Sequence, residues 1–305
     1  MKLQELKFKD IKWINITQPD QEMVDYLESN FRFHPLDLED VLSKTTYPKI
    51  DVYSKYLFII LQFPVYEKAR HIFKRSELSI FFSKDYLITI NDGALSPLTE
   101  VFEKCMKDRN LQEEFMEQGV PMLLWEVLDS HMDYVFPILS EKNDLIFDLE
   151  EEIYEKPKLT DMIKEIMTVK RDIINIRRIL APQRQVFADL AHRHALFIPA
   201  EQNAYFEDLV DKQDKISNQL ETSQAYIDLL EDANESLIGR NTNNIVKTLT
   251  IFTVITQLPP IIFDYYGMNI NLPFQDSSHA LTWINLVTLL SVVGIIIYFR
   301  RKEWF

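Results

Sequence analysis

The hydrophobic residues are most concentrated near the C-terminal end of the chain. Residues 281–299 contain no charged side chain. At ~1.5 Å rise per residue, a helix of this length crosses a hydrocarbon layer of ~30 Å. Trp283 and Tyr298 lie near the two ends of the segment, where aromatic residues favour the membrane interface. The pattern predicts a transmembrane helix over 281–299.

A second apolar segment, at about 245–266, has the length of a membrane span but contains Lys247 and the adjacent prolines at 259 and 260. The link at 269–280 contains no Lys or Arg, whereas Arg240 precedes the first segment and residues 300–305 form a basic tail. Cytosolic flanks of membrane spans are enriched in Lys and Arg. We therefore expect a multi-pass hairpin with both termini in the cytosol and the link outside.

Polar side chains of the first apolar segment share one face of the predicted helix. At ~100° of rotation per residue, they fall within about 40° of a line through Gln257. A carboxylate that faces lipid costs ~2.5–3.5 kcal/mol, so this face must meet protein or water. One hairpin cannot enclose water, which indicates several copies around a pore; polar contacts that only join helices are the alternative. The face comprises Asn243, Thr250, Thr253, Gln257 and Asp264.

The first 118 residues mix short β-type runs with helical segments. Runs at 56–65, 77–83 and 86–91 are rich in β-branched and aromatic residues, which predicts strands. Turns are expected at Ser76-Glu77 and at Asn91-Asp92-Gly93. Residues 1–10 lack the apolar core of a signal peptide. We predict a compact cytosolic α/β domain over residues 1–118.

Long, charged helical patterns begin after residue 118. Residues 119–200 are expected to form antiparallel helices, at 122–155 and 159–195. A basic run at 170–184 is expected to face the acidic residues 150–152. No proline occurs between Pro199 and Pro259, and apolar residues recur with the spacing of a helix seam. This predicts a stalk helix within 201–268 that continues into the first membrane span.

Composition limits the classes of function. The 305 residues include 47 Asp and Glu against 33 Lys and Arg, a formal net charge of −14. This disfavours nucleic-acid binding, because phosphate contacts need a basic surface. Only five glycines are present, which disfavours P-loop and dinucleotide folds. The single cysteine, Cys105, excludes a disulfide within the chain. No Ser/His/Asp or Cys/His arrangement stands out, so we expect neither an enzyme nor an organic cofactor.

Gly267-Met268-Asn269 follows an aromatic pair at the outer end of the first predicted span. In this position it resembles the Gly-Met-Asn signature of the CorA magnesium transporter family. The segments 33–40, 47–49 and 56–58 are similar to the N-terminal pattern of that family, and the resemblance extends over nearly the whole chain. It implies an α+β cytosolic domain followed by a long α-helical stalk and two C-terminal transmembrane helices. It also implies a homo-oligomeric, pentameric funnel in the lipid bilayer of the plasma membrane.

The resemblance implies roles for individual residues. The Gly-Met-Asn residues would form the selectivity filter, in which neutral oxygens hold hydrated Mg²⁺ by outer-shell hydrogen bonds. The transported ion would be Mg²⁺, with Co²⁺ or Ni²⁺ as further cargo. The filter would be Gly267, Met268 and Asn269, and the pore would be lined by Asn243, Leu249, Thr250, Thr253, Gln257 and Asp264.

The segment 205–211 resembles the family segment that binds regulatory divalent ions between subunits. Asp208 matches the family aspartate, Asp211 follows it, and Glu67 is the match for an acidic residue on the neighbouring α/β domain. Opposed carboxylates repel each other and a bound cation removes the repulsion, so low cytosolic Mg²⁺ would loosen the ring and open the pore. The alternative is that Asp208 and Asp211 are ordinary exposed helix charges. With Asn269 of the filter, these three residues are the predicted metal ligands.

Two residues depart from the family pattern. Gln257 takes the place of a common bulky apolar constriction, and Asp264 takes the place of a small residue. A ring of Asp264 carboxylates would concentrate cations, which suggests a preference for Co²⁺, Ni²⁺ or Zn²⁺, or sensitivity to protons. Two other functions stay open: a zinc transporter of the ZntB type, with proton coupling, and a membrane-anchored sensor or scaffold that conducts no ion.

Overall fold

The computed structural model describes residues 2–43, 47–155, 159–192, 197–269, 273 and 278–304. The chain divides into two compact units, Met1–Glu231 and Asp232–Phe305. Most of the link expected at 269–280 lies outside the described residues.

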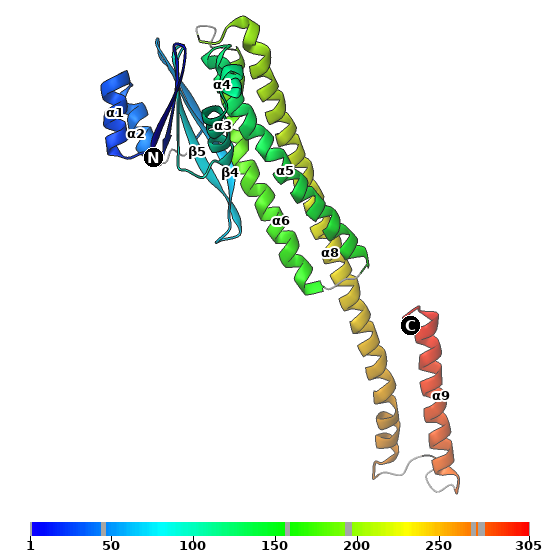
Figure 1. The fold of residues 1–305 in the computed structure, drawn as a ribbon. Helices are drawn as coiled ribbons and strands as arrows, with labels where there is room; N and C mark the ends of the chain where they lie inside the picture. Colours follow the sequence, from blue (N-terminus) through cyan, green and yellow to red (C-terminus); the bar gives the residue numbers. More distant parts are fainter. Residues whose placement is uncertain are drawn as a thin grey trace. The chain divides into compact units, whose positions relative to one another are not determined.

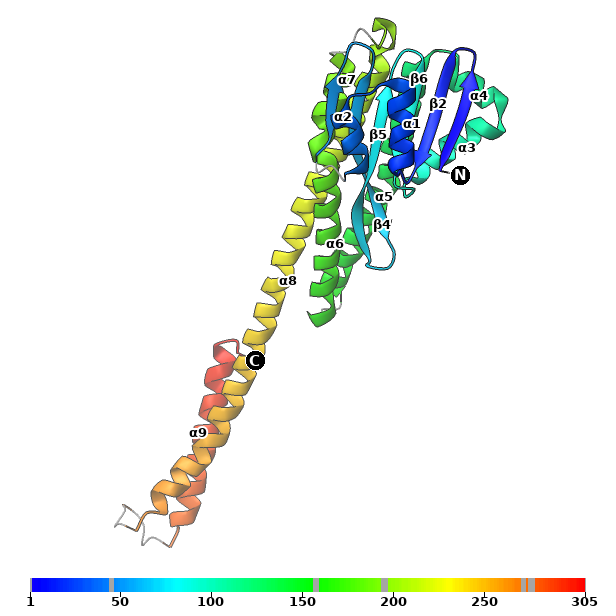
Figure 2. The same cartoon turned by 90° about the vertical axis from the view of Figure 1, so that its left-hand side faces the viewer.

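A six-stranded mixed sheet forms the centre of the first unit (Figures 1 and 2). The strand order is β1-β2-β6-β5-β4-β3. Strands β2 and β6 are parallel, and the other neighbouring strands are antiparallel. The three expected strands are confirmed as β4, β5 and β6. The strands are β1 (Leu3–Phe8), β2 (Ile11–Thr17), β3 (Lys49–Val52), β4 (Leu57–Glu67), β5 (Ile72–Phe82) and β6 (Tyr86–Asn91).

One of the two expected turns is wrong. Ser76 and Glu77 lie inside β5, opposite Phe63 and Gln62 of β4. The chain reverses between Glu67 and Ile72 instead, because long-range pairing with β4 outweighs the local preference of a polar dipeptide.

The turn after β6 is confirmed. Gly93 has φ +87°, a left-handed conformation that glycine adopts without strain. Its backbone N–H donates a hydrogen bond to Oδ1 of Asn91 at 2.7 Å.

Helices cover both faces of the sheet. On one face, α1 (Gln21–Phe31) and α2 (Pro35–Leu42) bury Leu27 and Leu38 against sheet residues that include Ile14 and Phe81; Figure 2 shows both helices in front of the strands. Because side chains alternate along a strand, Trp13 points to the other face. There its ring meets Phe102 with the centroids 4.8 Å apart.

The other face is covered by longer helices. The segment expected to be one helix at 159–195 is interrupted, because Pro182 lies in a 3-10 turn at Ala181–Gln183 that separates α6 from α7; proline cannot donate a backbone hydrogen bond inside a helix. The remaining helices are α3 (Ser96–Lys107), α4 (Arg109–Met116), α5 (Val120–Glu155), α6 (Leu159–Leu180), α7 (Arg184–His192), α8 (Asn203–Tyr266) and α9 (Ala280–Arg301).

The basic run between residues 170 and 184 pairs with α8, and the expected pairing with residues 150–152 is wrong. Glu150 accepts a hydrogen bond from Tyr226 of α8 instead. Helix α8 runs through the first unit with acidic residues at helical spacing, so it offers closer partners than the end of α5 does. The ion pairs are Lys170 with Asp228 (2.8 Å) and Glu231 (2.5 Å), Arg177 with Glu221 (2.7 Å), and Arg184 with Asp214 (2.6 Å).

The second unit contains the C-terminal part of α8 and the whole of α9, which lie side by side (Figures 1 and 2). Both helices are long and apolar enough to cross a membrane. The two predicted spans therefore coincide with helices.

Candidate functional site

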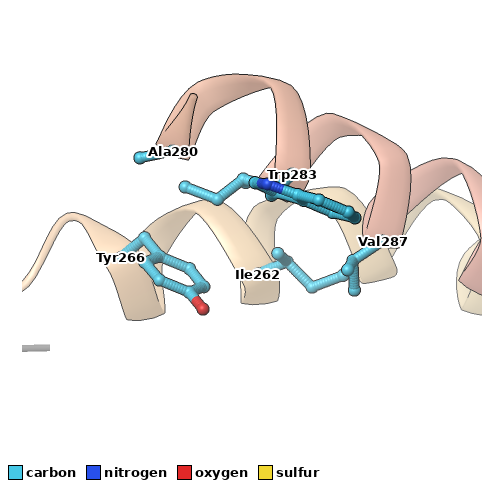
Figure 3. Close-up of a pocket in the computed structure, with 6 residues that line it drawn as sticks. Ile262, Tyr266, Ala280, Trp283 and Val287 are labelled. Atoms are coloured by element: carbon cyan, nitrogen blue, oxygen red, sulfur yellow. The ribbon is translucent and has the colours of Figure 1, made fainter. Parts of the chain in front are cut away.

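Helix α9 covers one side of the C-terminal part of α8. Ile251 of α8 is 4% exposed. Towards the end of α8, Ile262 and Tyr266 line a pocket of ≈ 440 Å³ together with Trp283 and Val287 of α9 (Figure 3). This side of α8 is therefore committed to contacts within the chain.

The predicted polar stripe lies on a different side of α8. At ~100° per residue, the covered residues Ile251 and Ile262 are about 120–140° away from Gln257. Every residue of the stripe is exposed, and Leu249, at the edge of the stripe, is 63% exposed. A single chain thus leaves the whole stripe uncovered: Asn243, Thr250, Thr253, Gln257 and Asp264.

The stripe contains two kinds of polar group. The hydroxyls of Thr250 and Thr253 donate to the carbonyls of Val246 and Leu249, each at 2.8 Å, so these threonines are satisfied within the helix. The side chains of Asn243, Gln257 and Asp264 have no hydrogen-bond partner among the described residues. In a membrane, such groups need protein or water beside them, so the amides and the carboxylate require something outside the single chain.

The adjacent prolines do not interrupt α8. Pro259 and Pro260 lie inside the helix, which continues to Tyr266. Neither proline carries a backbone N–H. The backbone carbonyls of Ile255 and Thr256, which are close to Gln257 in the chain, therefore lack the hydrogen-bond donors that they would have in an ordinary helix. The unbroken helix also keeps Gln257 and Asp264 on one face, as the sequence predicts.

The Gly-Met-Asn segment begins where α8 ends. The backbone N–H of Gly267 donates to the carbonyl of Phe263 at 2.8 Å, and a Cβ atom at position 267 would lie 3.2 Å from that oxygen. The chain therefore leaves α8 directly after a last helical hydrogen bond made by Gly267. Met268 and Asn269 follow and are both exposed.

The acidic residues expected to bind regulatory ions lie in the first unit and are not brought together within one chain. Glu67 ends β4 and lies 3.9 Å from the ammonium of Lys74. Asp208 and Asp211 are exposed on α8. The described residues contain no group of three or more Asp, Glu, His or Cys side chains with the geometry of a metal site. A regulatory ion at Asp208 would therefore need ligands from a second copy.

A lysine occupies the centre of the acidic residues next to Asp208. The ammonium of Lys212 lies 2.5 Å from Asp129, 2.7 Å from Asp133 and 3.9 Å from Asp208. Burial opposes the charge on Lys212, but its hydrogen bonds to the two α5 carboxylates outweigh burial and raise its pKa. Burial also raises the pKa of Asp129, although Lys212 acts in the opposite direction. The i, i+4 spacing of Asp129 and Asp133 places both carboxylates on one face of α5, but only the fold places Lys212 opposite them.

The family and the relatives of the chain agree with this architecture. A family model described as "CorA-like Mg2+ transporter protein" matches residues 8–301. The cobalt/magnesium transport protein CorA of Thermotoga maritima is 28% identical over an alignment of 309 residues, which covers 98% of this chain and 86% of that protein. The protein of the same name from Methanocaldococcus jannaschii is 23% identical. That alignment covers 99% of this chain and 95% of the M. jannaschii protein.

A solved structure and a zinc transporter extend the comparison. The complete structure of the CorA magnesium transporter from M. jannaschii superposes with a TM-score of 0.84 at 21% identity, covering 99% of this chain and 95% of that one. The zinc transport protein ZntB of Yersinia enterocolitica is 20% identical, but the match covers only 59% of this chain and 55% of that protein.

The family model spans both units and includes the two apolar helices, the polar stripe and the Gly-Met-Asn segment. Members of this family move ions across membranes and are not enzymes. The chain is therefore a divalent metal transporter of the membrane, and it belongs to the CorA-like Mg²⁺ transporter family.

Proposed function

We propose that this protein is a homopentameric channel that passes Mg²⁺ across the plasma membrane, with Co²⁺ and Ni²⁺ as further cargo. The observation that carries the proposal is the polar stripe of α8, which α9 leaves uncovered. Several copies of the hairpin would enclose the stripe, with Asn243, Thr253 and Asp264 facing a common water-filled path. Helix α9 would then lie on the lipid side, where its apolar residues are at no disadvantage.

The Gly-Met-Asn segment is proposed as the selectivity filter. Mg²⁺ dehydrates reluctantly and is usually bound with several of its waters in place. The amide oxygen of Asn269 and the nearby backbone carbonyls are neutral acceptors that can hold these waters without trapping the ion. Gly267 would set the position of the filter, because the chain leaves α8 at this residue.

Gating is proposed to depend on divalent ions bound between subunits. Asp208 and Asp211 are exposed and Glu67 lies at the end of β4, so all three can meet a neighbouring copy. A bound Mg²⁺ would offset the repulsion between facing carboxylates and hold the subunits together. Loss of that ion at low cytosolic Mg²⁺ would favour the open state.

The proposed orientation places both termini in the cytosol. Arg300 and Arg301 end α9 and Lys302 follows, and Arg240 precedes the apolar part of α8. Because Lys and Arg accumulate on the cytosolic side of membrane spans, Gly267, Met268 and Asn269 would lie at the outer surface.

A zinc transporter of the ZntB type is the second candidate. The observation that favours it is the exposed carboxylate of Asp264, three residues before the start of the filter segment. In a pentamer these carboxylates would repel one another and bind protons or tightly held cations more readily than a neutral ring.

A flux assay on reconstituted liposomes tests both candidates. Uptake of Mg²⁺, Co²⁺, Ni²⁺ and Zn²⁺ would be followed separately at two pH values. The magnesium proposal predicts Mg²⁺ uptake that needs no proton gradient. Zn²⁺ uptake that requires a proton gradient, without Mg²⁺ uptake, would favour the zinc transporter. Failure of all four ions to pass would favour a sensor or scaffold that does not conduct.

A further inference from the structure

A hollow of ≈ 620 Å³ lies in the first unit, and its described lining includes no residue of α8. It is formed where α1 ends and α2 begins, where β4 starts, and where β5 turns into β6. Its described lining is mainly basic and aromatic and includes Arg32, His34, Tyr53, Lys55, Lys84 and Tyr86.

The charge of this hollow is opposite in sign to that of the chain. Arg32, Lys55 and Lys84 are exposed, and none of them forms an ion pair with another residue in the described parts of the chain. Asp85 is the one acidic residue among the described lining residues. With histidine counted as neutral, the three cations and one carboxylate give the lining a net charge of +2, against −14 for the chain. The hollow therefore favours an anion.

An aromatic stack stands at one side of the hollow. The ring of His34 lies 5.7 Å from that of Tyr53 at 25°, and Tyr53 lies 4.5 Å from Tyr56 at 18°. Both tyrosine hydroxyls donate to the buried carboxylate of Asp37, at 3.0 and 2.8 Å. These bonds fix the two tyrosine rings and so present a prepared stack.

His34 ends the stack and is itself fixed. Its Nδ1 accepts a hydrogen bond from the backbone N–H of Leu36 at 3.3 Å, which caps α2. In the neutral ring the proton therefore lies on Nε2, where it can be donated. The side chain is exposed, and within the described structure only Tyr53 stacks on it. One face of this ring is thus free for another flat group.

We propose that this hollow binds a nucleoside phosphate, with the base on His34 and the phosphates among Arg32, Lys55 and Lys84. The cations would bind the phosphates, and the free face of the His34 ring would stack on the base. Aromatic side chains stack on nucleobases with little dependence on which base is present. The site uses side-chain cations and needs no glycine-rich loop.

A ligand bound in the hollow would contact the segment that leads into α8. Phe197 is another lining residue, and it lies three residues before the 3-10 turn Ala200–Gln202 that leads into α8. A bound nucleotide would thereby contact both the α/β layers and the segment that enters the long helix. Binding itself can be measured without transport, so the proposal stands or falls independently of the proposed channel function.

The test is a calorimetric titration of the full-length protein in detergent, with the probes ATP, inorganic triphosphate and adenosine. The phosphate contacts would be removed in the double variant Arg32→Ala/Lys84→Ala. The stacking contact would be removed in His34→Asn, because asparagine can still cap α2. Arg70→Ala/Lys68→Ala is the matched control, since it removes one Arg and one Lys from the exposed β4–β5 turn.

The expected result is that ATP binds more tightly than either inorganic triphosphate or adenosine. Arg32→Ala/Lys84→Ala should weaken ATP binding by at least ~tenfold, His34→Asn should reduce the preference for ATP over triphosphate, and the control pair should leave the affinity unchanged. Absence of ATP binding would overturn the proposal. So would ATP binding that the Arg32/Lys84 pair does not affect, or triphosphate binding as tight as that of ATP.

Discussion

The ammonium of Lys212 lies 2.5 Å from the carboxylate of Asp129 and joins α8 to α5. Asp129 is only 16% exposed at its side chain, so the chain neutralises this carboxylate with its own cation. A divalent ion at Asp208 must therefore bind next to a positive charge, which lowers its affinity.

Replacement of Lys212 by Met should make the protein more dependent on divalent cations. Loss of the ammonium leaves Asp129 and Asp133 unpaired, and the free energy of unfolding should fall by about 1–3 kcal/mol in a chelator. Added Mg²⁺ should then raise the melting temperature more in the variant than in the wild type. Lys215→Met, at an exposed position of α8 without a described ion pair, is the control. Equal stabilisation of wild type and Lys212→Met by Mg²⁺ would refute this interpretation.

Asp264→Asn should reduce cation uptake at low ion concentration. In the proposed pentamer, five Asp264 carboxylates near the outer mouth would concentrate cations there, and asparagine amides would not. We expect flux in liposomes to fall several-fold at low Mg²⁺ and to converge with the wild type as Mg²⁺ saturates. Asp264→Glu, which keeps the charge, should retain the low-concentration flux. If the Asn variant has the same concentration dependence as the wild type for every ion, Asp264 does not face the ion path.

Gly267→Ala should impair transport while the protein remains folded. The added Cβ would lie 3.2 Å from the carbonyl oxygen of Phe263 and 3.5 Å from that of Asp264, so this end of α8 or the Gly-Met-Asn segment has to give by a few tenths of an ångström. Gly239→Ala is the contrasting change, because a Cβ there meets nothing within 4 Å and alanine favours a helix by ~1 kcal/mol. Thermal unfolding and Mg²⁺ flux should separate the two variants. Full flux in Gly267→Ala would show that transport does not require a residue without a side chain at position 267.

His131 should make the fold sensitive to acid. Complete burial lowers its pKa to about 4, although the hydrogen bond to Val127 opposes this shift. The unfolded chain therefore binds a proton on this residue below pH ~6.5, whereas the folded chain does not. Its contribution should reduce the free energy of unfolding by about 3 kcal/mol as the pH falls from 6.5 to 4.

The measurement for His131 is thermal unfolding of the full-length protein over that pH range, compared with His131→Gln. The variant should lose less stability than the wild type on acidification, whatever its stability at pH 7.5. Parallel curves for the two proteins would show that His131 is not the group that titrates.

The membrane half of the structure follows closely from the sequence. An uncharged segment such as 281–299 is expected to form a helix in a bilayer, because a helix satisfies all of its own backbone hydrogen bonds. The helical period of 3.6 residues is enough to place Gln257 and Asp264 on one face of α8. The effect of Pro259 and Pro260 could not be predicted in the same way. A proline pair removes two helical hydrogen bonds, and only the structure shows that α8 continues.

The first unit was less predictable because its contacts are distant in sequence. The pairing of β5 with β4 placed Ser76-Glu77 inside a strand, against the local turn signal. Likewise, Lys212 and Asp129 are 83 residues apart, and no periodicity connects them. The metal ligands Glu67, Asp208 and Asp211 remain predictions, because their proposed partners would come from a second copy.

The central claim is that the polar stripe of α8 borders the ion path, and cysteine accessibility tests it most directly. Cys105 is 1% exposed, and burial raises the pKa of its thiol to about 11, so it should react little with thiol reagents. Thr253→Cys introduces a thiol on the stripe, and Phe252→Cys introduces one beside it on another face of α8.

A charged, membrane-impermeant thiosulfonate would be added to liposomes during Mg²⁺ uptake. We predict that the reagent blocks uptake through Thr253→Cys and leaves Phe252→Cys and the wild type unaffected. Block of Phe252→Cys with continued flux through Thr253→Cys, or insensitivity of both variants that otherwise conduct, would contradict the account.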